Sequence, residues 1–119
     1  MNHPDNSFIQ FLEDNIAECA RQSVALTGDD RRDEANFVNI RKNIYEVFLT
    51  VYNTAIRTCK DDAAAEVFFS DKLSNIPSNW AASLEKAEAH GDTAKAYIER
   101  IKLEAAKAIS ERFSTIRRF

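Results

Sequence analysis

The sequence predicts an all-α protein folded as an elongated up-down helical bundle. Three observations lead to this prediction. The chain contains only two glycines and two prolines, its apolar residues recur at spacings of three and four, and helix-capping residues separate the apolar segments. A chain of 119 residues is also long enough to bury one core without a metal or disulfide. We therefore expect a single helical domain over residues 1–119.

The first predicted helix begins near Ser7, because the sequence from Ser7 to Gln10 has the S-x-x-Q form of a capping box. Its apolar stripe repeats at helical intervals and consists of Phe8, Leu12, Ile16, Cys19 and Val24. Thr27 and Gly28 are expected to end the helix. Asp30 then becomes the expected N-cap of the second helix, since its carboxylate can accept hydrogen bonds from the first free N–H groups.

The second predicted helix, from about Arg31 to Lys60, is the longest and the least one-sided. At 1.5 Å per residue it would be about 42–45 Å long, which requires an elongated molecule. One apolar stripe consists of Phe37, Ile40, Ile44, Phe48, Val51 and Ala55, and a neighbouring one of Val38, Tyr45, Leu49, Tyr52 and Ile56. A helix apolar over this much of its circumference must be covered on two or three sides. It is either the central helix of the bundle or part of a dimer interface.

The third rod of the bundle is predicted to be broken at Pro77. A short helix over residues 62–75 should stop there, because Pro77 disfavours helical geometry at Ile76. Ser78 can then cap another short helix over residues 79–90.

A tight corner is predicted next, in which Gly91 supplies a left-handed residue and Asp92 caps the following helix. The last helix begins at Thr93 and runs nearly to the end of the chain. The prediction is thus four rods in up-down-up-down order and five helices in total. A looser arrangement of five helices is the alternative.

Charge is distributed unevenly along the chain, whose formal net charge is −3. Residues 93–119 hold seven basic and three acidic groups, so residues 1–92 carry a charge of −7. The N-terminus has no basic segment followed by an apolar run, and no apolar run reaches the about 18 residues that a membrane helix needs. We therefore expect a cytoplasmic protein that does not bind a membrane.

The two cysteines, Cys19 and Cys59, are too few for a disulfide scaffold and are not in C-x-x-C spacing. In a helical hairpin that turns near Gly28 they would lie about 30 Å apart along the axis. A disulfide requires Cα atoms within about 7 Å. Two free thiols are predicted.

The motifs of common enzyme classes are missing from the sequence, so we predict no enzyme activity, no cofactor and no metal. A di-metal bundle would need E-x-x-H pairs, but the only histidines are His3 and His90, and neither follows a glutamate by three positions. There is no G-x-S-x-G nucleophile motif. Gly28 and Gly91 are isolated and form no phosphate-binding loop.

Protein contact is the function that the sequence favours. The twelve aromatic residues are many for a small helical chain, and the second helix has more apolar surface than one seam requires. One candidate interaction patch on this helix consists of Tyr45, Leu49, Tyr52 and Ile56. If the bundle leaves this patch uncovered, it would be buried against a second copy, giving a homodimer, or against a helix of another protein. The opposite possibility is that all four residues fill the protein's own core.

A nucleic-acid-binding accessory or regulatory protein that uses the basic last helix is the alternative function. Against it, Arg100 with Glu104 and Lys107 with Glu111 stand four residues apart, as in surface ion pairs. Glu99 also neighbours further lysines of this helix. Much of the positive charge is therefore expected to be paired within the protein.

Overall fold

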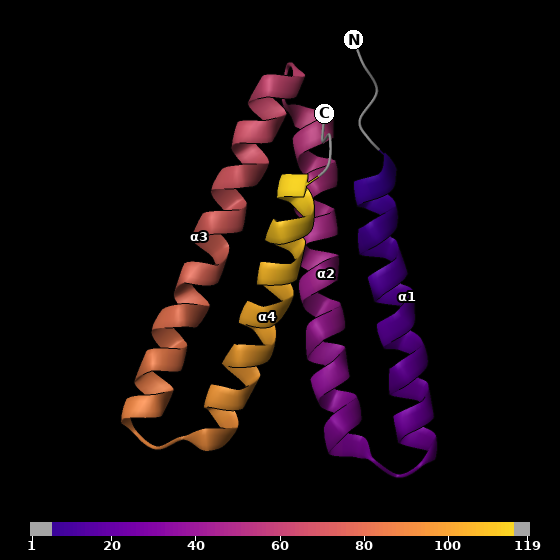
Figure 1. Cartoon of the computed structure of the whole chain (residues 1–119), viewed down its shortest axis with the longest axis vertical. Helices are drawn as coiled ribbons and strands as arrows, with labels where there is room; N and C mark the ends of the chain where they lie inside the picture. Colours follow the sequence, from indigo (N-terminus) through magenta and orange to yellow (C-terminus); the bar gives the residue numbers. More distant parts are fainter. Residues whose placement is uncertain (1–5, 116–119) are drawn as a thin grey trace.

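Four helices make up the computed structural model, which describes residues 6–115. They are α1 (Asn6–Gly28), α2 (Arg32–Thr58), α3 (Asp62–Ala89) and α4 (Thr93–Thr115), and consecutive helices run in opposite directions (Figure 1). The predicted all-helical, up-down arrangement is confirmed for this part of the chain. The molecule measures 49 × 35 × 23 Å. Its radius of gyration of 15.9 Å exceeds the about 13–14 Å of a compact domain of this length, so it is elongated.

The third rod is one helix, so the predicted break at Pro77 and the count of five helices are wrong. α3 runs without interruption over 28 residues with Pro77 inside it. A proline removes one intrahelical hydrogen bond and disfavours helical geometry before it. Packing of α3 against α4 outweighs this local cost, since the residues next to Pro77, which include Asn75, Ser78 and Asn79, are not strong helix formers. Ser78 caps nothing and instead donates a hydrogen bond to the Asn75 carbonyl at 2.6 Å.

The corner between α1 and α2 also differs from the prediction, because Asp30 is not an N-cap. Asp30 has a left-handed backbone with φ of 61°. The Arg31 N–H donates to the Leu26 carbonyl at 2.8 Å, and the Asp30 N–H donates to the Thr27 carbonyl at 3.1 Å. These bonds form a Schellman motif that closes α1. Asp30 thus ends the first helix, and α2 begins after Arg31 without a side-chain cap.

The corner between α3 and α4 follows the prediction. Gly91 is left-handed with φ of 69°, and the Asp92 N–H donates to the Ala87 carbonyl at 2.9 Å. The Asp92 carboxylate accepts a hydrogen bond from the Lys95 N–H at 3.1 Å and so caps α4. Both corners therefore use the same closing motif, one with glycine and one with aspartate at the left-handed position.

A cluster of four aromatic rings, one from each helix, lies at the centre of the core. It consists of Phe8, Tyr52, Phe69 and Phe113. The Phe8 ring centre lies 4.9, 5.6 and 5.3 Å from the centres of the Tyr52, Phe69 and Phe113 rings. The Phe69 and Phe113 centres are 4.7 Å apart. These edge-to-face and tilted contacts add to the stability gained from burying the rings.

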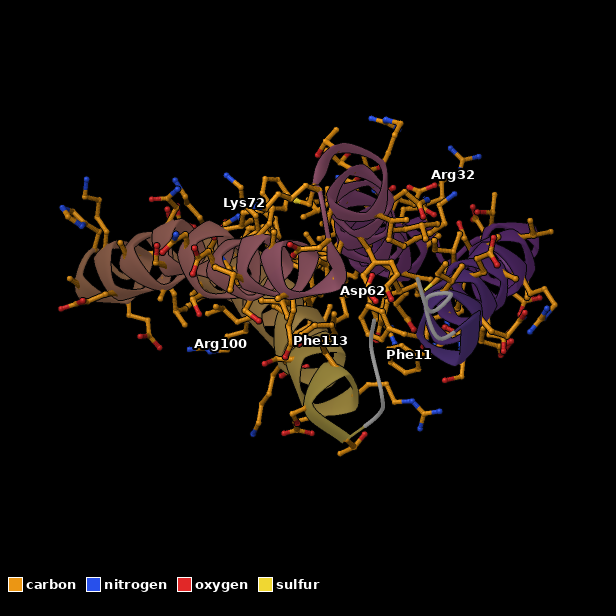
Figure 2. The ribbon with its side chains drawn as sticks, turned by 90° about the horizontal axis from the view of Figure 1, so that it is seen from above. Phe11, Arg32, Asp62, Lys72, Arg100 and Phe113 are labelled. Atoms are coloured by element: carbon orange, nitrogen blue, oxygen red, sulfur yellow. The ribbon has the colours of Figure 1, made fainter. Side chains whose placement is uncertain are left out.

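The two helical hairpins, α1–α2 and α3–α4, are joined near this cluster and diverge away from it (Figure 1). Seen from above, α1 and α3 lie on opposite sides with α2 and α4 between them (Figure 2). Consistent with this, α2 packs against all three other helices, whereas α1 and α3 meet through the rings of Phe8 and Phe69. Of the two positions that the sequence left open for the second helix, the described residues show the central one. Val24, expected in the apolar stripe, is 74% exposed because α1 continues beyond the core.

Glu99 of α4 is a charged side chain inside the α3–α4 hairpin, with only 5% of its surface exposed. Its Oε1 accepts a hydrogen bond from Lys102 Nζ at 3.2 Å. Its Oε2 is buried and has no hydrogen-bond partner among the described residues. Lys102 Nζ also lies 5.9 Å from the centre of the Trp80 ring on α3. Lys102 therefore compensates the buried charge of Glu99 and links the two helices.

Replacing Pro77 with alanine should stabilise the protein, because alanine restores the missing helical hydrogen bond. We expect Pro77→Ala to raise the free energy of unfolding by about 1–3 kcal/mol, measured by urea denaturation. Ser74→Ala, an exposed change one turn earlier on α3, is the control and should stay within about 0.5 kcal/mol. A Pro77→Ala variant no more stable than this control would contradict the interpretation.

Replacing Lys102 alone should lower the free energy of unfolding more than replacing both Glu99 and Lys102. Lys102→Met leaves a buried carboxylate without its counter-ion and should lower the free energy of unfolding by about 1–3 kcal/mol, less than for a fully buried pair because Lys102 is partly exposed. The double change Glu99→Leu with Lys102→Met should recover most of this loss. Urea denaturation of the four proteins of the cycle measures the coupling. A double variant whose loss equals the sum of the two single losses would rule the coupling out.

Candidate functional site

The structure divides the four residues of the predicted interaction patch into two pairs. Tyr45 and Tyr52 are 4% and 0% exposed and belong to the core. Leu49 and Ile56 are half-buried at its edge. Members of each pair stand seven residues apart, so each pair lies on one side of α2. The tyrosines face the aromatic core, which leaves only Leu49 and Ile56 for contact with a partner.

A hollow of about 460 Å³ lies next to Leu49, between α1 and α2. Leu49 and Ile16 are its large apolar lining residues, and Glu13 and Glu46 are its charged ones. Ile9 stands seven residues before Ile16, and Ile56 seven after Leu49, so these two half-buried side chains extend the same strip on the antiparallel helices. We call this strip the α1–α2 seam: Ile9, Glu13, Ile16, Glu46, Leu49 and Ile56.

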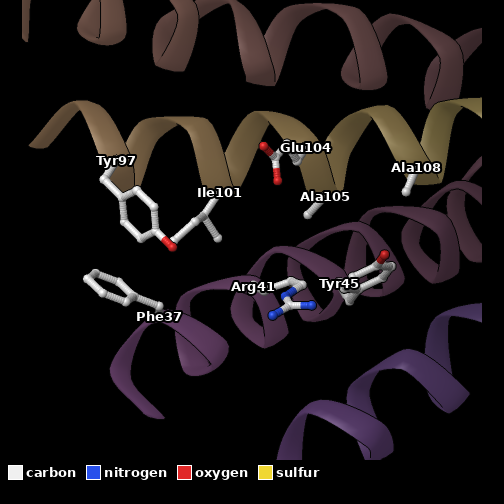
Figure 3. A pocket seen from close by; sticks show the side chains of 8 residues that line it. All are labelled: Phe37, Arg41, Tyr45, Tyr97, Ile101, Glu104, Ala105 and Ala108. Carbon is white, nitrogen blue, oxygen red and sulfur yellow. The ribbon is translucent and has the colours of Figure 1, made fainter. Parts of the chain in front are cut away.

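A second hollow, of about 340 Å³, lies between α2 and α4 where the hairpins diverge (Figure 3). We call it the α2–α4 crevice. Its lining residues are Phe37, Arg41, Tyr45, Tyr97, Ile101, Glu104, Ala105 and Ala108. Apart from Tyr45, the predicted patch did not include any of them.

The charged and aromatic groups of the α2–α4 crevice lie on facing helices. Phe37 and Tyr97 are in edge contact at one end, with ring centres 4.7 Å apart. Arg41 of α2 and Glu104 of α4 both line the hollow, and in Figure 3 the Arg41 guanidinium overlies α2. Among the described residues, neither forms an ion pair within 4.0 Å. The crevice thus combines apolar lining residues with two exposed, opposite charges that have no ion-pair partner in the described part of the chain.

Tyr45 separates the crevice from the buried thiol of Cys19. Burial raises the pKa of the Cys19 thiol above its ordinary value of 9.0, and Arg41 lowers it in part. Burial likewise raises the pKa of the Tyr45 phenol above 10.0, with a further increase from Cys19. Both groups are therefore neutral near pH 7 and unsuited to nucleophilic attack. Cys59 is half-buried, and both cysteines are free, as predicted.

Most basic side chains of α4 already have partners within the protein. Lys107 pairs with Glu111 at 4.0 Å, as predicted. The i, i+4 spacing predicted an ion pair between Arg100 and Glu104. In the structure Arg100 instead pairs with Glu88 of α3 at 2.6 Å. The neighbouring helix brings a carboxylate closer than the same helix does.

Two further cations of α4 are also in contact with other groups. Lys102 pairs with the buried Glu99, and the Arg112 guanidinium lies 5.5 Å from the centre of the Phe11 ring. Arg117 and Arg118 lie outside the described residues. Little of the positive charge on the described part of α4 is left for a phosphate backbone.

The described residues around His90, at the corner between α3 and α4, do not form a metal site. No group of three or more His, Cys, Asp or Glu side chains there could hold an ion. His90 Nδ1 lies 2.8 Å from the Lys86 carbonyl oxygen. His3 is outside the described residues. None of the described helices is both long and apolar enough to cross a bilayer.

No protein-family model, curated protein or solved structure matches this chain.

The raised pKa values predict a loss of stability in alkaline solution. A folded-state pKa above the unfolded value means that the unfolded chain releases its proton first, so the free energy of unfolding falls as pH rises past the ordinary values of 9.0 and 10.0. Below the lower of these values the stabilisation is fully present. Urea denaturation between pH 7 and 10.5 should show this decrease, and a Cys19→Ala, Tyr45→Phe variant should show a smaller one. An equal decrease in that variant would contradict the assignment.

Proposed function

We propose that this protein is an interaction module without catalytic activity, and that it binds a helix of another protein along the α1–α2 seam. The observation that carries the proposal is the hollow between Ile16 and Leu49, whose charged lining residues are both carboxylates. An amphipathic helix is the usual ligand of an apolar strip between two helices. Contact with the half-buried Leu49 and Ile56 would then be the accessible part of the patch that the sequence predicted.

The charges define the kind of helix that fits. Glu13 and Glu46 lie beside the middle of the seam, so basic residues at the middle of the partner helix would complement them. Lys42 stands seven residues before Leu49 and places a positive charge nearer the Gly28 corner. The best partner is therefore a helix with an apolar face and a basic central turn, not a uniformly charged one.

The energetics favour modest affinity. Full burial of one aliphatic side chain contributes about 1.5–3 kcal/mol, whereas association costs about 4–15 kcal/mol in lost freedom of motion. Four half-buried apolar residues, each already partly covered, leave a small surplus: Ile9, Ile16, Leu49 and Ile56. We expect dissociation constants on the order of micromolar for a single site.

The nucleic-acid alternative receives less support, because α4 supplies few cations without partners. Arg100, Lys102 and Lys107 are in ion pairs within the described part of the chain. A protein that holds DNA or RNA depends on such cations for most of its affinity.

Binding of two synthetic peptides tests the proposal. One is an 18-residue amphipathic helix with a leucine face, lysines confined to its central turn and uncharged polar residues elsewhere, and the other has glutamate in place of these lysines; each carries a fluorescent label for anisotropy. We expect the lysine peptide to bind more tightly. Glu13→Gln with Glu46→Gln should weaken it about tenfold, since two partly exposed ion pairs contribute about 0.5–1 kcal/mol each. Ile16→Ser with Leu49→Ser should weaken both peptides.

The matched control removes the same charge from another helix. Asp71→Asn with Glu85→Gln changes two exposed carboxylates on α3 and should leave the affinity within about twofold. Amide chemical-shift changes should map to α1 and α2. Equal weakening by the seam and control variants would show nonspecific attraction to an acidic protein and contradict the proposal.

A further inference from the structure

The α2–α4 crevice has features that the α1–α2 seam does not use. Glu46 follows Arg41 by five residues, which turns it by about 140° around α2, so the two surfaces lie on different sides of that helix. The crevice has its own hollow, a half-exposed tyrosine ring and two opposite charges without ion-pair partners among the described residues. Its occupant is therefore a separate question from the partner helix proposed above.

We infer that the α2–α4 crevice is the contact surface of a two-fold symmetric homodimer. In such a dimer each copy contributes the same surface. If residue i of one copy contacts residue j of the other, then residue j of the first copy contacts residue i of the second. Arg41 and Glu104 meet this requirement. Arg41 of one copy would pair with Glu104 of the second copy, and the symmetry generates the second ion pair.

Charge complementarity selects the second copy as the occupant. A cation on α2 and an anion on α4 border the crevice, so the surface carries both members of each required pair. The α1–α2 seam lacks this property, because two copies meeting there would bring Glu13 and Glu46 against the same carboxylates.

The apolar groups of the crevice fit the same arrangement. Tyr97 is 49% exposed, which makes it one of three large apolar side chains exposed in the described part of the molecule. It stands at the edge of a hollow of about 340 Å³ lined by Ile101, Ala105 and Ala108. The Tyr97 ring packs edge-on against Phe37 of its own copy, so each copy offers a half-exposed aromatic pair at one end of the hollow. Tyrosine is enriched in the buried centres of protein interfaces, where its ring packs and its hydroxyl finds a polar partner.

The test measures molecular mass by sedimentation and light scattering at protein concentrations from micromolar to about 0.5 mM. The unchanged protein should move from 13.5 kDa towards twice that mass as the concentration rises. Arg41→Glu and Glu104→Arg each place like charges opposite one another in both symmetric contacts. Each variant alone should be monomeric over this range.

Mixing the two variants provides the decisive measurement. The Arg41→Glu copy presents two carboxylates at the crevice and the Glu104→Arg copy presents two guanidinium groups, so both contacts between unlike copies join opposite charges. An equimolar mixture should therefore form a 1:1 heterodimer, identified by native mass spectrometry of copies with tags of different mass. The chain carrying both changes should dimerise with itself. Arg57→Glu, an exposed charge reversal elsewhere on α2, is the matched control and should dimerise like the unchanged protein.

Two results would overturn the inference. One is an unchanged protein that stays monomeric at about 0.5 mM. The other is a mixture that stays monomeric while the doubly changed chain dimerises, because this would mean that the charges act within one copy. Arg41 and Glu104 are exposed, and circular dichroism should show all variants to be equally helical. Peptide binding at the α1–α2 seam is unaffected by either result, so the proposed function is tested separately.

Discussion

The contact among Phe8, Tyr52, Phe69 and Phe113 is the interaction on which the rest of the structure depends, since each of the four helices contributes one ring to it. It joins the two hairpins at the centre of one shared core, and the Phe48–Trp80 and Phe37–Tyr97 contacts join them again further along. Within the α3–α4 hairpin, the Glu99–Lys102 pair of α4 lies against Trp80 of α3. Because the shared core lies at one end, the central helices α2 and α4 are left only partly covered at the other. The α2–α4 crevice is a direct result.

Helical periodicity was sufficient to predict the all-helical fold and the order of the four rods, and it left the central position of α2 as one of two alternatives. It failed where one local pattern serves two structures. Pro77 is a boundary signal, but its single missing hydrogen bond is small compared with 28 residues packed along α4. Aspartate is a good N-cap residue and also tolerates a left-handed backbone. Asp30 adopts the left-handed backbone because the hydrogen bonds that close α1 require it. In both cases tertiary or neighbouring contacts decided between locally reasonable alternatives.

The candidate site was less predictable than the fold. The sequence shows that α2 is apolar on several sides, but not which side meets which neighbour, so Tyr45 and Leu49 looked equivalent although one is core and the other is edge. The α2–α4 crevice brings Phe37 against Tyr97, a residue of the last helix far along the chain. No local pattern encodes such a pairing, because it depends on the angle at which the hairpins diverge. The one available signal was that Tyr97 and Ile98 are adjacent, although the apolar stripe of the last helix needs only one of them.

Because the aromatic cluster lies at one end, a small change in the angle between the two hairpins there produces a large displacement at their far ends. From Phe69 to the end of α3 at Ala89 is about twenty residues, a distance of about 30 Å at helical rise. A tilt of about 5° at the cluster therefore displaces the far corner by about 3 Å, roughly the diameter of a water molecule. The spacing between the corners at Asp30 and Gly91 consequently depends on the distant ring cluster as well as on the nearer Phe37–Tyr97 contact. Substitutions that alter ring size in the cluster would act as a remote adjustment of the width of the opening.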